Sequence, residues 1–225
     1  MSEAPVGVLG GTFDPIHRGH LEIARWLLDS LRPTRMLLLP CAVPPHKNPT
    51  VLAAAEHREA MLRLALRGSR RLELCRLELE TGGVCYTIDS LRRLRDERGI
   101  ARPVFIMGMD ALVELPTWRE FERLVDEFDL VVVDREENTL EASRPRLHPR
   151  VTERIQPALP VLQMAEALVR GGPGRIFPMA HPPIPVSSSA IRRRIAAGGS
   201  LDDLVPPAVA RYIRAHALYR QEDGR

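Results

Sequence analysis

Gly10-Gly11-Thr12-Phe13-Asp14-Pro15-Ile16-His17-Arg18-Gly19-His20 is the stretch that decides the fold of this chain. It follows the apolar run Val6 to Leu9 and precedes a helical pattern from Leu21 to Leu31. A buried strand, a glycine turn and a helix start can bind phosphate, because the first turn of a helix offers unpaired N–H groups and a partial positive charge. Glycines let a ligand approach the backbone, since they lack Cβ and accept unusual dihedral angles.

Two histidines add chemistry to this helix start. His17 and His20 are three residues apart, so they share one face if the turn is helical. Two imidazoles on one face can donate hydrogen bonds to phosphate oxygens without a permanent charge. A glycine turn between a strand and a helix often binds nothing, but the His-x-x-His pair favours a nucleotide site. The stretch is neither a Walker A loop nor the dinucleotide fingerprint G-x-G-x-x-G.

The composition favours a single domain that handles small anionic molecules. The chain has 225 residues and a formal net charge of +3, with length enough for a sizeable core. Its basic residues are spread along the chain, which favours small anionic ligands over nucleic acid. Cys41, Cys75 and Cys85 lack metal-ligand spacing, so we expect free thiols. No apolar run reaches membrane-spanning length and residues 1–5 do not resemble a signal peptide, so we expect a cytoplasmic protein without a membrane partner.

Apolar runs and helical patterns alternate along the first part of the chain. Strands are expected at Val6–Leu9, Met36–Pro40, Leu72–Leu79, Val104–Gly108 and Leu130–Val133. Helices are expected at Gly19–Leu31, Ala53–Arg67, Thr87–Arg98 and Thr117–Phe128. Thr117 and Glu120 have the spacing of a capping box for the last of these helices. The β-α-β-α order predicts an α/β fold, a Rossmann-like open parallel sheet with helices on both faces and ligands at the carboxyl ends of its strands.

The rest of the chain is less regular. Residues 136–185 hold many prolines and are expected to form a long excursion with a short strand at Ile176–Met179. Two helices are expected after it, at Ser189–Ala197 and Pro206–Leu218. We therefore expect residues 1–185 to form a Rossmann-like core and residues 186–225 to add a small helical extension to the same domain.

The stretch from Gly10 to Leu21 resembles the signature of the HxGH nucleotidyltransferase superfamily, written here as His17-Arg18-Gly19-His20. Its residue pattern is most similar to that of the nicotinate-nucleotide adenylyltransferases. The resemblance implies transfer of the adenylyl group of ATP to nicotinate mononucleotide, giving nicotinate adenine dinucleotide and pyrophosphate in NAD biosynthesis. It assigns to the ATP site Gly10, Gly11, Thr12, Phe13, His17, Gly19 and His20.

A second anion site is indicated at Val186-Ser187-Ser188-Ser189-Ala190-Ile191-Arg192. Serines in front of a helix can simply cap its N–H groups. The stretch also resembles the Ile-Ser-x-Thr-x-x-Arg motif with which the family grips the triphosphate, with Val186 for Ile and Ser189 for Thr. Since hydroxyls remain at both serine positions, the resemblance assigns Ser187, Ser189 and Arg192 to ATP.

The same resemblance assigns residues of two further loops to ligand binding. Pro44-Pro45-His46-Lys47 is stiffened by its prolines and carries the single lysine of the chain. It can be a plain surface loop, but the family's Pro-Pro-His-Lys/Arg element contacts phosphates, which assigns Lys47 to substrate. Gly108-Met109-Asp110 follows a buried run. Asp110 can cap the next helix, but the family's Gly-x-Asp lies beside the nucleotide, which assigns Gly108 and Asp110 to ATP.

Trp118, in Leu115-Pro116-Thr117-Trp118, is a candidate to stack on a flat heterocycle. From the residues alone, packing in the core is the slightly better interpretation. The family places its pyridine ring against the Trp of a Leu-Pro-x-Trp motif, and its Tyr-Thr-x-x-(Ser/Thr)-Leu element lines the same pocket. The resemblance therefore assigns Trp118, Tyr86 and Thr87 to the substrate. Trp26 is expected in the core.

The resemblance implies a mechanism that needs no activated nucleophile. A phosphate oxygen of nicotinate mononucleotide attacks the α-phosphorus of ATP, so the protein supplies positioning and charge neutralisation. His20 is assigned to the α-phosphate, and His17, Lys47, Ser187 and Arg192 to the leaving phosphates. The expected catalytic set is His17, His20, Lys47 and Arg192. Mg²⁺ would be bound mainly by the phosphates of ATP, without a metal site built from protein ligands.

Other functions remain open at this point. The chain can instead use nicotinamide mononucleotide or phosphopantetheine as the acceptor, or be a non-catalytic nucleotide sensor. The residues do not separate the acid from the amide of the pyridine ring, and a homo-oligomer is possible. Arg58 matches the family in position but is expected on a helix surface. Arg135 lacks the Pro-Gly that follows it in the family, so its contact with adenine is in doubt.

Overall fold

The computed structural model describes residues 4–43, 52–134, 139–182 and 184–220. Six strands form one sheet in the order β3-β2-β1-β4-β5-β6, and every neighbouring pair is parallel. The strands are β1 (Val6–Gly11), β2 (Met36–Pro40), β3 (Leu72–Leu74), β4 (Pro103–Gly108), β5 (Asp129–Val133) and β6 (Ile176–Met179). This arrangement confirms the expected Rossmann-like α/β fold.

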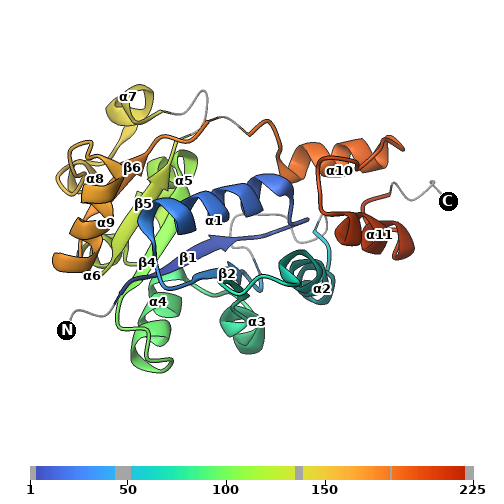
Figure 1. Cartoon of the computed structure of the whole chain (residues 1–225), viewed down its shortest axis with the longest axis horizontal. Helices are drawn as coiled ribbons and strands as arrows, with labels where there is room; N and C mark the ends of the chain where they lie inside the picture. The colour runs from blue at the N-terminus through green and yellow to red at the C-terminus, as the bar shows by residue number, and fades with distance from the viewer. Residues whose placement is uncertain (1–3, 44–51, 135–138, 183, 221–225) are drawn as a thin grey trace.

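Helices cover both faces of the sheet (Figure 1). They are α1 (Arg18–Leu31), α2 (Ala55–Leu66), α3 (Leu77–Thr81), α4 (Thr87–Asp96), α5 (Met109–Glu114), α6 (Phe121–Glu127), α7 (Leu140–Ser143), α8 (Pro149–Thr152), α9 (Val161–Arg170), α10 (Ser188–Ala196) and α11 (Pro207–Ala215). Short 3₁₀ turns lie at Leu115–Thr117 and Arg144–Arg146. Within the described residues, no helix is long and apolar enough to cross a membrane.

Two apolar clusters form the core, one on each side of the sheet. Successive strand residues point to opposite faces, so Leu38 packs in one cluster while Leu37 and Leu39 pack in the other. The first cluster receives α1, α2, α9, α10 and α11, and the second receives α3, α4, α5, α6 and α8. This double burial explains why the strands read as continuous apolar runs.

The chain order reverses between β1 and β4, which are neighbours in the sheet. The connection from β1 leads toward β2 on one side, and the connection from β4 leads toward β5 on the other. The loops that leave these two strands therefore diverge, and a crevice opens outside their carboxyl ends. Ligands bind at this position in open parallel sheets.

The expected strand Leu72–Leu79 is wrong in its second half. β3 ends at Leu74, and the chain turns into α3, where Leu77 is buried. β3 is an edge strand that pairs only with β2, and edge strands are kept short. The apolar spacing changes from two residues to three after Leu74, which breaks the alternation that a strand requires.

The helix expected at Thr117–Phe128 is present only as α6, Phe121–Glu127, so its expected start and its capping box are wrong. Thr117 closes a 3₁₀ turn, and its hydroxyl donates to the carbonyl oxygen of Glu114 at 2.7 Å. Glu120 takes a left-handed conformation with φ 50° and starts α6, so it cannot cap a helix that begins earlier. The excursion over residues 136–185 contains α7, α8 and α9 besides the expected strand β6.

Candidate active site

A cleft of about 470 Å³ opens at the carboxyl ends of β1 and β4. Its lining includes eight of the residues assigned from the sequence: Gly10, Gly11, Thr12, His20, Tyr86, Thr87, Gly108 and Trp118. Residues far apart in the chain therefore meet in one cavity. Of the assigned histidines only His20 lines the cleft, while His17 stacks on it and Arg192 is bonded to Asp14 in the same loop. We call these three residues the histidine end, and we call Tyr86, Thr87, Trp118 and Arg119 the aromatic end.

The two glycines of the signature are needed for close packing. β1 continues through Gly10 and Gly11, with neither residue at positive φ. A Cβ on Gly10 would lie 2.7 Å from the ring of Phe105, so only glycine fits there. The left-handed residue of the turn is Phe13, with φ 49°. Its side chain is buried and meets His20 edge to face at 5.0 Å between ring centroids, so it supports the imidazole.

His17 and His20 form a capping box at the start of α1. The backbone N–H of His20 donates to Nδ1 of His17 at 3.4 Å, and that of His17 donates to Nδ1 of His20 at 3.3 Å. The rings stack at 3.6 Å between centroids. A nitrogen that accepts a backbone N–H carries no proton, so each neutral ring holds its proton on Nε2. Both imidazoles are thereby set as Nε2–H donors.

The helix start offers fewer backbone donors than the sequence suggests. The N–H of Arg18 donates to the carbonyl oxygen of Leu204 at 2.9 Å, and the N–H of His20 is held by His17. Two of the first three N–H groups of α1 are thus satisfied inside the protein. An anion at this point would depend chiefly on the imidazoles.

The start of α10 is tied to the signature loop. The hydroxyl of Ser188 donates to the carbonyl oxygen of Pro15 at 3.1 Å, and Nη1 of Arg192 donates to that of Asp14 at 2.7 Å. Ser187 caps the helix by accepting the N–H of Ala190 at 3.2 Å. Nη2 of Arg192 reaches Ser189 Oγ at 3.4 Å. The two predicted phosphate motifs are therefore adjacent, although 165 or more residues separate them in sequence order.

Arg58 has a role that the sequence does not reveal. It was expected on a helix surface, but it is buried under the loops that leave β1 and β2. Its guanidinium donates to four carbonyl oxygens, those of Thr12 (3.0 Å), Cys41 (2.7 Å), Ala42 (2.7 Å) and Ala53 (3.2 Å). One arginine therefore joins the signature loop to the chain on both sides of residues 44–51.

The aromatic end is more open. Trp118 is partly buried, meets Phe105 edge to face at 6.2 Å and lines the cleft, so it both packs and faces a ligand. Tyr86 precedes α4, and Thr87 is its first residue. The guanidinium of Arg119 lies 4.7 Å from the centre of the Tyr86 ring. Arg119 is the one Lys or Arg among the described residues that line the cleft, and no sequence motif pointed to it.

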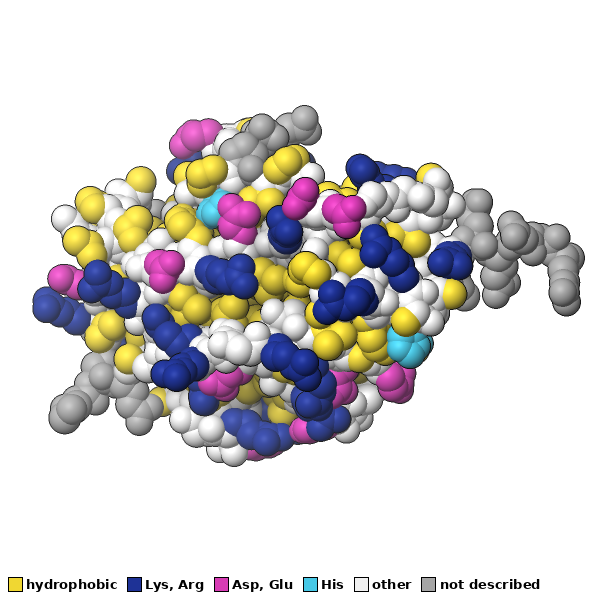
Figure 2. Space-filling model, turned by 45° about the vertical axis from the view of Figure 1, so that its right-hand side comes forward, with side chains coloured by type: hydrophobic (Ala, Val, Ile, Leu, Met, Phe, Trp, Pro, Cys, Tyr) yellow, Lys and Arg dark blue, Asp and Glu magenta, His cyan; other side chains and the backbone are white. Residues whose placement is uncertain are grey.

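The remaining assigned residues are placed differently. Asp110 lies exposed in the first turn of α5, beyond Gly108, and is not among the residues that line the cleft. Gly19 is buried in the first turn of α1. Lys47 and Arg135 lie outside the described residues. Arginine and acidic side chains are interspersed over the surface in Figure 2, and such exposed pairs each contribute little stability.

A buried carboxyl also lines the cleft. Glu78 accepts a hydrogen bond from the hydroxyl of Ser90 at 2.6 Å. Burial raises the pKa of Glu78 above its ordinary value, and the bond from Ser90 opposes this only in part. The side chain therefore takes up a proton more readily than an exposed glutamate. Cys41 and Cys85 also line the cleft, and neither forms a disulfide.

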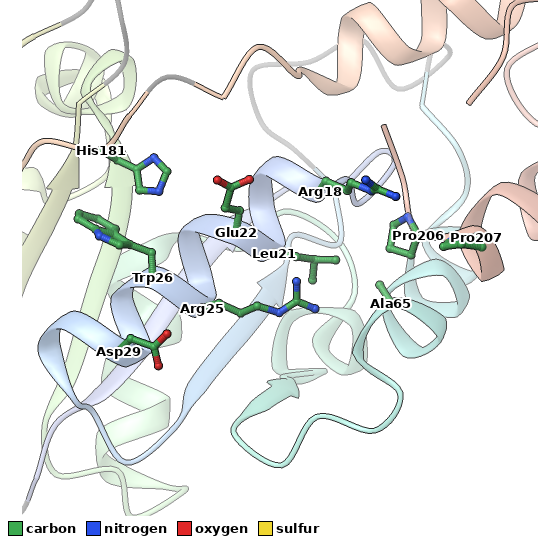
Figure 3. Close-up of a pocket in the computed structure, with 10 residues that line it drawn as sticks. All are labelled: Arg18, Leu21, Glu22, Arg25, Trp26, Asp29, Ala65, His181, Pro206 and Pro207. Carbon is green, nitrogen blue, oxygen red and sulfur yellow. The ribbon is translucent and has the colours of Figure 1, made fainter. Parts of the chain in front are cut away.

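A second hollow, of about 640 Å³, lies on the outer face of α1. In Figure 3, Glu22, Arg25 and Asp29 project from α1 beside it, and Trp26 meets His181 edge to face at 4.7 Å. Trp26 is only partly buried against the core. The hollow contains neither His17 nor His20, so it is not the site that the signature builds.

Comparisons with known proteins agree with this geometry. The family model described as cytidylyltransferase-like matches residues 8–194. A protein of Symbiobacterium thermophilum named "probable nicotinate-nucleotide adenylyltransferase" is 40% identical over 216 residues, covering 96% of this chain and 95% of its own. One of Stenotrophomonas maltophilia with the same name is 41% identical over 217 residues, covering 94% and 95%. The chain belongs to the nicotinate-nucleotide adenylyltransferase family.

Solved structures support the fold of this family member. The Plasmodium falciparum nicotinic acid mononucleotide adenylyltransferase complexed with NaAD matches with a TM-score of 0.71. The match covers 96% of this chain and 97% of the Plasmodium chain at 18% identity. At that identity the likeness supports the Rossmann-like architecture alone.

Proposed function

We propose that this family member transfers the adenylyl group of ATP to nicotinate mononucleotide, giving nicotinate adenine dinucleotide and pyrophosphate. The observation that carries the proposal is the cleft itself. It joins the imidazole of His20, which is stacked on His17, at one end to an aromatic ring and a cation at the other. These two ends suit the two parts of the reaction, a polyphosphate and a pyridine nucleotide.

The histidine end would carry the chemistry. In-line attack by the acceptor phosphate on the α-phosphorus of ATP requires positioning and neutralisation of charge. Nε2–H of His20 would donate to the α-phosphate, since His20 lines the cleft. His17, Ser187, Ser189 and Arg192 would hold the leaving pyrophosphate. Lys47 and Asp110 remain assigned through the resemblance alone.

Magnesium would enter with the nucleotide. Within the described residues, no group of three or more His, Cys, Asp or Glu side chains could hold a metal ion. The donors near the signature are imidazoles and a guanidinium, which suit phosphate better than a hard cation. Phosphate oxygens and water would therefore supply the ligands of Mg²⁺, which would further neutralise the charge of the polyphosphate.

Arg119 favours the acid over the amide as acceptor. It is placed over Tyr86, beside Trp118, where a stacked pyridine ring would present its carboxylate. An arginine attracts a carboxylate and gives nothing comparable to a carboxamide. Its own ion contacts, Asp89 at 3.7 Å and Glu120 at 3.9 Å, are long, so they hold it only weakly.

The test is turnover with matched acceptors. The protein is mixed with Mg-ATP and either nicotinate mononucleotide, nicotinamide mononucleotide or phosphopantetheine, while pyrophosphate release and product mass are followed. We expect fast release and the mass of nicotinate adenine dinucleotide with the acid only. Equal rates with the amide would overturn the specificity, and turnover with phosphopantetheine alone would overturn the proposed acceptor. Release with none of the three would contradict the activity.

A further inference from the structure

Four segments of the chain meet at the carboxyl group of Asp14, which is 1% exposed. Oδ1 accepts the hydroxyl of Tyr219 at 2.6 Å and the backbone N–H of Ala53 at 3.2 Å. The carbonyl oxygen of Asp14 accepts Nη1 of Arg192 at 2.7 Å, and Oδ2 lies 3.6 Å from the same nitrogen. The signature loop, the approach to α2, helix α10 and the chain after α11 thus meet at one residue.

Tyr219 reaches this point through a constrained turn. α11 ends at Ala215, and Ala217 and Tyr219 then take positive φ angles of 49° and 63°. Left-handed conformations are unfavourable for residues with a Cβ, so contacts must hold the turn. Leu218 and Tyr219 pack against the core, and the hydroxyl of Tyr219 closes the turn onto Asp14.

The hydroxyl of Tyr219 acts as a permanent donor. Burial, and after it the negative charge of Asp14, raises the pKa of Tyr219 far above its ordinary value. The phenol therefore keeps its proton and holds Oδ1. Oδ2 is buried without a hydrogen-bond partner among the described residues and faces Arg192.

The orientation of the Asp14 carboxyl therefore affects where Arg192 points. The side chain of Arg192 is 19% exposed, and its anchors are Asp14 and Ser189. If Tyr219 no longer donated to Oδ1, only the N–H of Ala53 would hold it, and the carboxylate could rotate and shorten the present 3.6 Å contact between Oδ2 and the guanidinium. Arg192 would then be drawn into the loop and away from a nucleotide.

We propose that Tyr219 is a positioning residue: its hydroxyl fixes Asp14, and Asp14 in turn holds Arg192 toward the polyphosphate of ATP. This inference rests on the proposed role of Arg192 in holding ATP. The C-terminal part of the described chain thereby belongs to the histidine end of the cleft, although Tyr219 touches no substrate.

The test compares two single-hydroxyl deletions. Tyr219→Phe removes the donor to Asp14. Tyr212→Phe removes a hydroxyl from α11 that contacts His57 Nδ1 at 3.0 Å instead. We expect Tyr219→Phe to raise the KM for ATP about fivefold, the size of effect expected for one ordinary hydrogen bond, because Tyr219 acts on ATP only indirectly. The KM for nicotinate mononucleotide should stay unchanged. Tyr212→Phe should change neither constant.

A double-mutant cycle connects the effect to Asp14. Asp14→Asn alone should also raise the KM for ATP, and adding Tyr219→Phe should raise it no further, since both act through one group. Additive effects would overturn the proposal. So would an unchanged KM for ATP in Tyr219→Phe, or an equal loss in both tyrosine variants that is explained by a lower melting temperature.

Calorimetric titration with ATP separates this inference from the proposed function. If the wild-type protein turns over none of the acceptors, the proposed function fails. Weaker ATP binding by Tyr219→Phe would still support the positioning role, and unchanged binding would overturn it. Both the turnover measurement and the calorimetric titration use the full chain.

Discussion

The histidine end and the aromatic end of the cleft are built in opposite ways. The histidine end is held by partly buried, directional hydrogen bonds that Arg58, Arg192, Ser188 and Tyr219 donate. At the aromatic end, Trp118 is half-buried, and Arg119 is half exposed with ion contacts longer than 3.5 Å. The histidine end, where adenylyl transfer would occur, is therefore held rigidly. The aromatic end, which would bind the pyridine ring, has more freedom to move.

This difference matches the demands of the proposed reaction. Transition-state stabilisation depends on donors that need no reorganisation, so a rigid support is an advantage at the histidine end. Stacking on a flat ring tolerates small shifts, so the aromatic end can be looser. Substitutions at the histidine end should therefore change rate or stability most, and those at the aromatic end should change preference between acceptors.

The largest effect is expected from His20→Ala. Loss of one donor to the reacting phosphate should lower kcat about 10²–10³-fold. Steady-state pyrophosphate release measures this change, and circular dichroism should show that the fold remains. His181→Ala, in the second hollow, is the matched control and should turn over at the wild-type rate. Near-normal kcat in His20→Ala would remove the histidine end from the chemistry.

Arg58→Met should give the largest loss of stability. The substitution keeps an unbranched side chain but leaves four carbonyl oxygens without their donor, at a cost of about 3 kcal/mol. Urea unfolding should show a lower midpoint with an unchanged slope. Arg63→Met, on the same helix, breaks only the exposed pair with Glu59 and should cost less than about 1 kcal/mol. Equal losses would mean that the histidine end is not specially rigid.

Arg119→Gln should reduce selectivity with little change in rate. A half-exposed cation contributes modestly, so the ratio of kcat/KM for the acid to that for the amide should fall about 2–5-fold. Arg123→Gln is the control, since Arg123 is exposed and contacts Glu120 at 3.3 Å. A ratio that stays constant in Arg119→Gln would exclude the side chain from acceptor choice.

The smallest effect concerns Glu78 and pH. Its pKa is raised in the folded state, so its contribution to stability is present below the unfolded pKa and is lost as pH rises through the folded pKa. Glu78→Gln keeps an acceptor for Ser90 but cannot ionise. The variant should therefore gain melting temperature over the wild type at pH 8 and gain less at pH 5. A difference that does not depend on pH would contradict the role of burial.

Much of the sheet could be predicted from local sequence. Met36–Pro40 is a strand with the expected ends, and the starts of α1 and α10 lie within one residue of expectation. These elements have strong apolar periodicity or a clear capping residue. Within the cleft, the signature residues and Tyr86, Thr87 and Trp118 could be predicted because they form contiguous motifs, whereas Arg119 belongs to none of these motifs.

What the sequence could not show depends on contacts between distant segments. The sequence around Arg58 has no feature that distinguishes a buried arginine, bonded to several backbone carbonyls, from one on a helix surface. Tyr219 and Asp14 are separated by 205 residues, so no local pattern predicts their hydrogen bond. The helix expected from Thr117 is interrupted at Glu120, which takes a left-handed conformation although it is not a glycine. Helix propensities do not predict such a residue.

Separate KM values for the two substrates in Arg192→Gln and Trp118→Ala test most directly whether the two ends do separate work. We expect a crossed result: about tenfold higher KM for ATP alone in Arg192→Gln, and about tenfold higher KM for nicotinate mononucleotide alone in Trp118→Ala. If both variants raised the same KM, or if each raised both equally, the division of the cleft into a histidine end and an aromatic end would be contradicted.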